Sequence, residues 1–399
     1  MRDPAIAAAI VLFGLALAAT LAILVWRRER QRRKARRREN PANDYAVRQD
    51  WSASPASLNH SSFVYFDLDR DGRFGLGDRP MGGVMVRLHD GNGRFAAQAR
   101  TNRSGFANFP VSTKYRKAAI HLPGTYRFTV SVPPGWRSSS ANHVQSQRFQ
   151  ALPGSPAGLV SEAMLQPVGL FPTRHLSGRV AAAATVSVER SGQVLAVHSL
   201  ADPAGFRFDL PDDADTIDVV GRGFVRRLTL SPYPTDLGLL SPEIPAIDSN
   251  AVLQTIGFDD VTPREFRKVP SGYAGFNWFN LNAISRDYLK EAEGYVNGNV
   301  SGDHTCYTSS GHPAEFDSEK PFGFHSVLLT AAWLKSEGEI ALVESWLGDR
   351  LIASDAVTLS ALTPVHYAPM LGQVTRVRFS TRHHWQLVLD DLVVARFID

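Results

Sequence analysis

The sequence predicts an all-β protein in which three β-sandwich units follow one N-terminal transmembrane helix. Three observations support this prediction. Residues 5–26 are almost all apolar, the later chain consists of short alternating runs broken by turn residues, and glycine (31) and proline (24) are plentiful. With 399 residues, 44% of them hydrophobic, the chain is long enough for about two to four domains with their own cores.

The apolar stretch is expected to be a retained membrane anchor. Its 22 residues contain no charge and no proline, and at about 1.5 Å per residue they cover the roughly 30 Å hydrocarbon core of a bilayer. A cleaved signal peptide is the alternative, but the segment is long for one and the residues before it are barely basic. Residues 27–38 follow at once with nine basic residues and one glutamate, a composition suited to anionic lipid head groups.

The charge of the remaining chain argues against binding to nucleic acid. The basic run contributes +8, so with a formal net charge of +4 for the whole chain the rest sums to about −4. No second basic stripe interleaved with aromatic residues follows downstream. Cys306 is the single cysteine, so the units must be stabilised by hydrophobic cores or bound metal and not by internal disulfides.

Residues 39–62 are polar and aperiodic and are expected to form a linker before a first sandwich at 63–170. Between its first two predicted strands the chain has the spacing D-x-D-x-D-G-x5-D, which is typical of a calcium loop. The alternative is an acidic turn without metal, in which four like charges repel one another. The predicted calcium ligands are the carboxylates of Asp67, Asp69, Asp71 and Asp78 and the main-chain carbonyl of Arg73.

The first unit resembles the B-type domain of serine–aspartate-repeat surface proteins, a calcium-binding prealbumin-like sandwich. Besides the aspartate loop, the resemblance rests on Ser104-Gly105-Phe106-Ala-Asn-Phe109 and on Val130-Ser-Val132-Pro133-Pro134-Gly135. It implies a stiff spacer and not an enzyme. Such modules are nearly always exported, whereas the basic run after the anchor favours a cytoplasmic position, so the side of the membrane is left open.

A second, shorter sandwich is predicted at 176–240, followed by a proline-bearing linker at 241–250. Its Ala204-Gly205-Phe206-Arg-Phe208-Asp-Leu210-Pro211 repeats the pattern of the Ser104 segment weakly. The unit resembles the carboxypeptidase regulatory-like (transthyretin-like) sandwich. Together with the first unit, it gives a predicted fold of two prealbumin/Ig-like sandwiches in series before the third unit. The aspartate loop is missing, and no metal is expected.

Residues 251–399 alternate as the strands of a two-sheet jelly roll. The succession from Phe258-Asp259-Asp260 through Pro270-Ser-Gly272-Tyr273 to Leu389-Asp390-Asp391-Leu392 is similar to a C-terminal domain of exosortase-sorted secreted bacterial proteins. That resemblance implies the architecture of carbohydrate-binding jelly rolls.

Two candidate sites are predicted in this third unit. Asp260 and Asp390, with their neighbours Asp259 and Asp391, would meet around a structural calcium if the first and last strands pair, unless one acid of each pair faces solvent. A platform on which a sugar ring could stack is predicted from aromatic residues, whose alternative role is core packing. These residues are Tyr273, Phe276 and Trp278.

The sequence contains no catalytic constellation. His304, Cys306, His312 and Glu315 are close in sequence, but their spacing fits no standard zinc site. We therefore predict a membrane-anchored, non-catalytic protein whose sandwich stalk presents the jelly roll to a surface or extracellular polysaccharide. The alternative is a structural envelope scaffold or an adhesin-like stalk that binds a protein.

Overall fold

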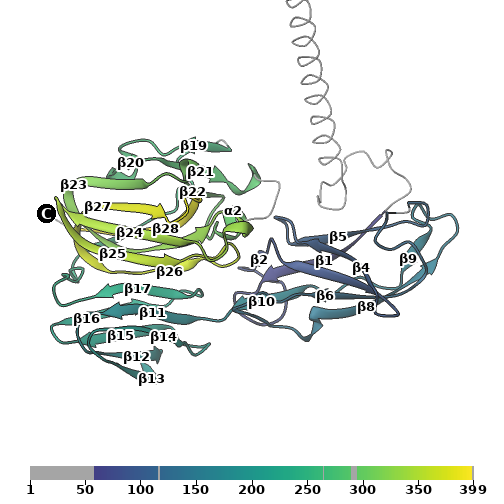
Figure 1. The fold of residues 1–399 in the computed structure, drawn as a ribbon, viewed down its shortest axis with the longest axis horizontal. Helices are drawn as coiled ribbons and strands as arrows, with labels where there is room; N and C mark the ends of the chain where they lie inside the picture. Colours follow the sequence, from purple (N-terminus) through teal and green to yellow (C-terminus); the bar gives the residue numbers. More distant parts are fainter. Residues whose placement is uncertain (1–57, 116, 264, 289–293, 398–399) are drawn as a thin grey trace, which may run out of the picture.

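The computed structural model describes residues 58–397 except 116, 264 and 289–293. The predicted anchor at 5–26, the basic run at 27–38 and most of the predicted linker lie outside this part of the chain. Within the described residues, no helix is both long and apolar enough to cross a membrane. Nearly all the regular secondary structure of the described chain is β-strand, which confirms the all-β prediction (Figure 1).

The first unit consists of two sheets that enclose a core of aliphatic and aromatic side chains. One sheet contains β1 (Leu58–Phe66), β2 (Arg79–Pro80), β5 (Phe106–Val111), β7 (Trp136–Ser138) and β10 (Val168–Pro172). The other contains β3 (Met85–Asp90), β4 (Phe95–Arg100), β6 (Gly124–Val130), β8 (Val144–Ala151) and β9 (Leu159–Ser161). Strand β1 begins at Leu58, inside the segment predicted as linker, because its outer half pairs with β5.

The second unit follows after Thr173 and Arg174. Its four-stranded sheet contains β12 (Ala184–Arg190), β13 (Gln193–Leu200), β15 (Thr216–Gly221) and β16 (Phe224–Thr229). Facing it are β11 (His175–Val180), β14 (Ala204–Asp209) and β17 (Thr235–Leu240). Alternation is regular in β16, where Phe224, Arg226 and Leu228 are buried and the residues between them are exposed.

The third unit contains the longest strands that the structure describes, wrapped around an apolar core. Its strands are β18 (Val252–Ile256), β19 (Phe266–Lys268), β20 (Asn277–Phe279), β21 (Leu281–Ser285), β22 (His304–Thr308), β23 (Ala314–Ala331), β24 (Ile340–Leu347), β25 (Arg350–Thr358), β26 (Val365–Tyr367), β27 (Leu371–Thr381) and β28 (Leu387–Arg396). One short helix, α2 (Gly294–Asn297), lies beside β23. Strands β18 and β28 pair, as expected for the first and last strands of this unit.

The units share sheets and cores. Strand β17 pairs in parallel with β26, with Thr235 opposite His366, so a single fourteen-stranded sheet runs from the second unit into the third. Tyr233 and Leu328 pack into the core of the first unit, and Met370 packs into that of the second. The interpretation as a stalk implied units arranged end to end. The structure shows another arrangement, in which the third unit lies along the second and the first unit lies beside both (Figure 1). The predicted boundaries between domains stay a prediction.

Candidate metal centre at the junction of the units

The loop between β1 and β2 brings together the best candidate ligands in the described chain. Asp67 follows β1 and Asp78 precedes β2, and the pairing of Phe66 with Arg79 closes the loop at its base. One carboxylate oxygen from each of Asp67, Asp69 and Asp71 lies within 4.8 Å of the others. Among the residues that the structure describes, no other three acidic, histidine or cysteine side chains meet this closely.

Main-chain amides hold these carboxylates in place. Asp67 is fully buried, and its two oxygens accept hydrogen bonds from the amides of Arg70 (2.7 Å) and Gly72 (2.9 Å). Gly72 has a φ of 75°, and a Cβ there would lie 3.2 Å from the carbonyl oxygen of Ser139, so glycine suits this turn. Asp71 Oδ1 accepts from the amide of Arg73 at 2.7 Å.

The predicted ligand Asp78 has a different place from the other three acids. Its two oxygens accept hydrogen bonds from the amides of Leu68 (2.9 Å) and Gly75 (2.8 Å), which ties the end of the loop to its start. Asp67, Asp69 and Asp71 are therefore the acids that the structure brings together. Ligation by Asp78 and by the Arg73 carbonyl stays a prediction.

Two buried hydroxyl groups beside the acids have no hydrogen-bond partner. They are Tyr65 Oη and Ser139 Oγ. A Cβ built on Gly169 would lie 2.3 Å from Ser139 Oγ, 2.8 Å from Tyr65 Oη and 2.9 Å from Asp67 Oδ2, so these three oxygens converge beside a residue without a side chain. Burial, and after it the charge of Asp67, raises the pKa of Tyr65, which keeps the phenol protonated. Alternation in β1 places Tyr65 and Asp67 on one face, but no sequence signal indicated Ser139.

A cluster made only of oxygen donors suits a hard cation such as Ca²⁺, which takes about six to eight oxygen ligands. Like charges this close also oppose one another unless a cation or protons compensate them. The donor set therefore fits a calcium ion chemically, and it offers no thiol or imidazole that would favour a softer metal.

The predicted second calcium site in the third unit needs a correction. Asp390 is fully buried, and its Oδ2 accepts hydrogen bonds from the amides of Val300 (2.6 Å) and Ser301 (3.2 Å). Burial, and after it the neighbouring Asp391, raises the pKa of Asp390. Asp260 instead accepts a hydrogen bond from the Tyr273 hydroxyl at 2.5 Å. Asp390 thus acts as an internal acceptor for a loop, and in the part of the chain that the structure describes neither it nor Asp260 belongs to a group of three clustered acidic, histidine or cysteine side chains.

The predicted sugar platform is wrong for two of its three residues. Phe276 is 1% exposed and Trp278 is 7% exposed, and both belong to the core of the third unit. Their rings pack against Phe316, at 5.3 and 5.2 Å between ring centroids, so neither offers a face to a ligand. Tyr273 is half-buried and packs against the same core. Core packing, the alternative role of these aromatic residues, is the one observed.

A wide groove of about 1110 Å³ opens where the three units meet. Its wall from the second unit is the outer face of β11, β14 and β17, with His175, Ser177, Arg207 and Asp209 along it. Strand β25 and the segment around Glu337 form the opposite wall. Sequence reasoning missed this groove because its two walls come from segments about 100 residues or more apart.

Comparisons with known proteins add only distant similarities. No family model and no curated protein matches the chain. Among solved structures, the Bacillus anthracis TIE protein aligns at 10% identity over 46% of this chain and 33% of its own, with a TM-score of 0.22. A shaft pilin SpaA from Lactobacillus rhamnosus GG aligns at 12% identity over 47% and 99% of the two chains (TM-score 0.22). The K1 cleaved adhesin domain of Lys-gingipain from Porphyromonas gingivalis W83 aligns at 12% identity over 37% and 99% (TM-score 0.22). These scores are too low to place the chain in a family, and none is assigned.

Proposed function

We propose that this protein is a calcium-stabilised, non-catalytic β-sandwich scaffold that residues 5–26 hold at a membrane. The observation that carries the proposal is the meeting of Asp67, Asp69 and Asp71 beside the unpartnered hydroxyls of Tyr65 and Ser139. Buried polar groups are normally paired, so two buried hydroxyls without partners next to three carboxylates support an ion or its bound water as the missing partner.

Calcium should stabilise the folded chain by mass action. A ligand at 100 times its Kd adds about 2.7 kcal/mol to the free energy of unfolding if the unfolded chain does not bind it. The test is thermal unfolding of the full chain in CaCl₂ and in EGTA, together with calorimetric titration of Ca²⁺. The double variant Asp69→Asn/Asp71→Asn should abolish both effects. It spares Asp67, which is buried and orders the loop.

The matched control is Asp349→Asn, which removes an exposed carboxylate in the turn between β24 and β25. This variant should bind and respond to calcium like the wild type. Equal melting temperatures of the wild type in CaCl₂ and in EGTA, with no heat of binding, would refute the proposal.

Binding of a polysaccharide is a second candidate function, and the inter-unit groove is the observation that favours it. A groove of about 1110 Å³ lined by hydroxyl, imidazole, guanidinium and carboxylate groups can form hydrogen bonds with several sugar hydroxyls. Binding of the full chain to an array of bacterial surface glycans tests this function. Arg207→Ala/Asp209→Ala should abolish any signal, whereas Phe279→Ala, on an exposed side chain away from the groove, should not. An array without signal refutes this candidate.

A further inference from the structure

Two arginines contact the other units from the candidate metal loop, which is the segment 67–78 between β1 and β2 and is called the metal loop below. Arg70 lies inside the loop, and Arg79 follows its last residue, Asp78. Their guanidinium groups point away from the first unit and donate hydrogen bonds to main-chain and side-chain oxygens of the second and third units. The loop is therefore also an interaction surface, and its partners are segments of the same chain.

Arg70 connects the loop to the second unit. Its amide donates to Asp67 Oδ1 at 2.7 Å, and its φ of 63° is left-handed, a conformation that costs free energy unless the surroundings enforce it. Its Nη1 donates to the carbonyl of Asp212 at 2.8 Å and lies 3.3 Å from Asp212 Oδ1. The guanidinium also lies 4.8 Å from the ring centroid of Phe171.

The segment that receives Arg70 is itself held in place. Arg174 is buried, and its Nη2 donates to the carbonyls of Pro211, Asp212 and Ala214, each at 2.8 Å. The turn at 211–214 is therefore a fixed docking point, which Arg70 reaches from the loop and Arg137 reaches from β7, with its Nη1 3.4 Å from Asp212 Oδ2.

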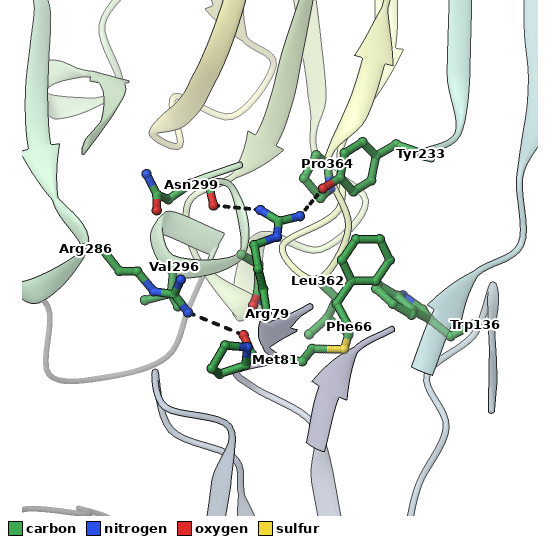
Figure 2. Close-up of a pocket in the computed structure, with 12 residues that line it drawn as sticks. Phe66, Arg79, Met81, Trp136, Tyr233, Arg286, Val296, Asn299, Leu362 and Pro364 are labelled. Carbon is green, nitrogen blue, oxygen red and sulfur yellow. Dashed lines mark hydrogen bonds between the residues drawn. The ribbon is translucent and has the colours of Figure 1, made fainter. Parts of the chain in front are cut away.

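Arg79 connects the loop to both other units (Figure 2). Its Nη1 donates to the carbonyls of Asn299 (2.9 Å) and Val300 (3.0 Å) in the third unit. Its Nη2 donates to the hydroxyl of Tyr233 in the second unit. The same guanidinium lies 5.3 Å from the ring centroid of Phe66, the residue directly before Asp67. Both ends of the metal loop thus belong to the three-unit junction.

We infer that cation binding at the loop locks the first unit onto the other two through Arg70 and Arg79. This inference rests on the proposed calcium function and adds a regulatory role to the same site. With the cation bound, the carboxylates of Asp67, Asp69 and Asp71 hold one loop conformation, and both guanidinium groups are presented to their acceptors. Without it, repulsion among the carboxylates loosens the loop, and the left-handed conformation of Arg70 loses its support.

The short covalent connection between the first and second units leaves their relative angle to be set by side-chain contacts such as those of Arg70 and Arg79. Only Thr173 and Arg174 separate β10 from β11, so the covalent link is short and the side-chain contacts fix the remaining angle. The segment just after the loop also contacts the third unit, because Asn297 Nδ2 donates a hydrogen bond to the carbonyl of Gly82 at 3.2 Å. These contacts are expected to loosen together with Arg79.

The test measures the distance between the first and second units in the full chain. Spin labels are attached to Thr125→Cys in β6 and Ser199→Cys in β13, both exposed positions, in a Cys306→Ser background. We expect one narrow distance peak in CaCl₂ and loss of that peak in EGTA. Calorimetric titration of Ca²⁺ is run on every variant.

The decisive variant is Arg70→Ala/Arg79→Ala, which leaves all three clustered carboxylates in place. It should still bind Ca²⁺ but should lack the narrow peak even in CaCl₂. Arg73→Ala is the matched control, since its side chain is exposed and only its main-chain carbonyl is a predicted ligand. It should behave like the wild type.

A second variant tests the same contacts from the other side, in case the arginine variant folds poorly. Asp212→Ala/Tyr233→Phe removes side-chain partners that lie outside the metal loop, and it should bind Ca²⁺ with a broadened distance distribution. The same narrow peak in CaCl₂ and EGTA, with calcium bound, overturns the lock while the proposed function stands. Absence of calcium binding in the wild type refutes the proposed function and the lock together.

Discussion

Phe276 provides a direct test of whether the aromatic residues of the third unit are core or ligand platform. The perturbation is Phe276→Ala, and Phe279→Ala is its matched control three positions along the chain. Phe276 is 1% exposed, whereas Phe279 is 60% exposed. If the cluster is core, the first substitution lowers the free energy of unfolding and the second does not.

The expected magnitude follows from the surroundings of the Phe276 ring. It lies 4.8 Å from Phe322, 5.3 Å from Phe316 and 5.9 Å from Trp278, measured between ring centroids. Arg396 covers it with a guanidinium 4.0 Å from the centroid. Truncation of a buried Phe to Ala costs about 3–5 kcal/mol, and lost aromatic and cation–π contacts favour the upper half of that range. At about 2–4 °C per kcal/mol, a loss in that upper half should lower the melting temperature by roughly 8–20 °C.

Urea unfolding followed by tryptophan fluorescence measures the difference, because Trp278 lies in the same cluster. Phe279→Ala should stay within about 0.5 kcal/mol of the wild type, as is usual for exposed side chains. Equal midpoints for the two variants would show that the ring of Phe276 contributes no packing, and the assignment to the core would then be wrong.

Three further predictions concern protonation, the metal site and orientation. Burial, and after it the charge of His325, lowers the pKa of His366 to about 4. Because the unfolded chain takes up this proton at a pH near 6.5 and the folded chain does not, stability is full above pH about 6.5 and falls by up to about 3 kcal/mol toward pH 4. His366→Gln should remove this part of the slope in urea titrations between those pH values. Gly169→Ala should weaken calcium binding in calorimetry, because its Cβ would enter the space between three site oxygens; unchanged affinity would exclude Tyr65 and Ser139 from the site. A cysteine at position 54 of a Cys306→Ser chain should react with an impermeant maleimide in spheroplasts, since extracellular modules bind calcium at about 10⁻⁴–10⁻³ M; protection until lysis would contradict an external site.

Sequence periodicity predicted most of the strands because it reports which side chains avoid water. In β16 the alternation of Phe224, Arg226 and Leu228 with exposed residues follows directly from the pleat of a strand. The acidic loop was predictable for the same local reason: its spacing places Asp67, Asp69 and Asp71 within a few residues of one another, so no long-range contact is needed to bring them together. Periodicity cannot show whether a strand extends into a neighbouring segment whose composition is typical of a linker. For this reason the first strand was predicted to start at residue 63, whereas β1 starts at Leu58.

Errors arose where the outcome depended on segments far apart in the chain. The burial of Phe276 is decided by Phe316 and Phe322 on β23, and the role of Asp390 by amides at 300 and 301, about 90 residues earlier. A run of aromatic residues has the same composition whether it faces a core or a ligand, so only the packing partner distinguishes the two.

The same limit explains why the junction of the units was not foreseen, and why it matters for function. In the sequence Arg70 looks like a solvated residue between two acids, and Arg79 looks like the first residue of a strand. Only their acceptors at Asp212, Tyr233 and Asn299 give them a role, and these lie between about 140 and 220 residues away. A rigid sandwich with a calcium loop could have that loop at any turn, since the ion needs only local ligands. Here Arg70 within the loop and Arg79 directly after it both contact other units, so we expect a change in the loop to displace groups at the junction, and the ion would then act on the whole assembly and not on one sandwich alone.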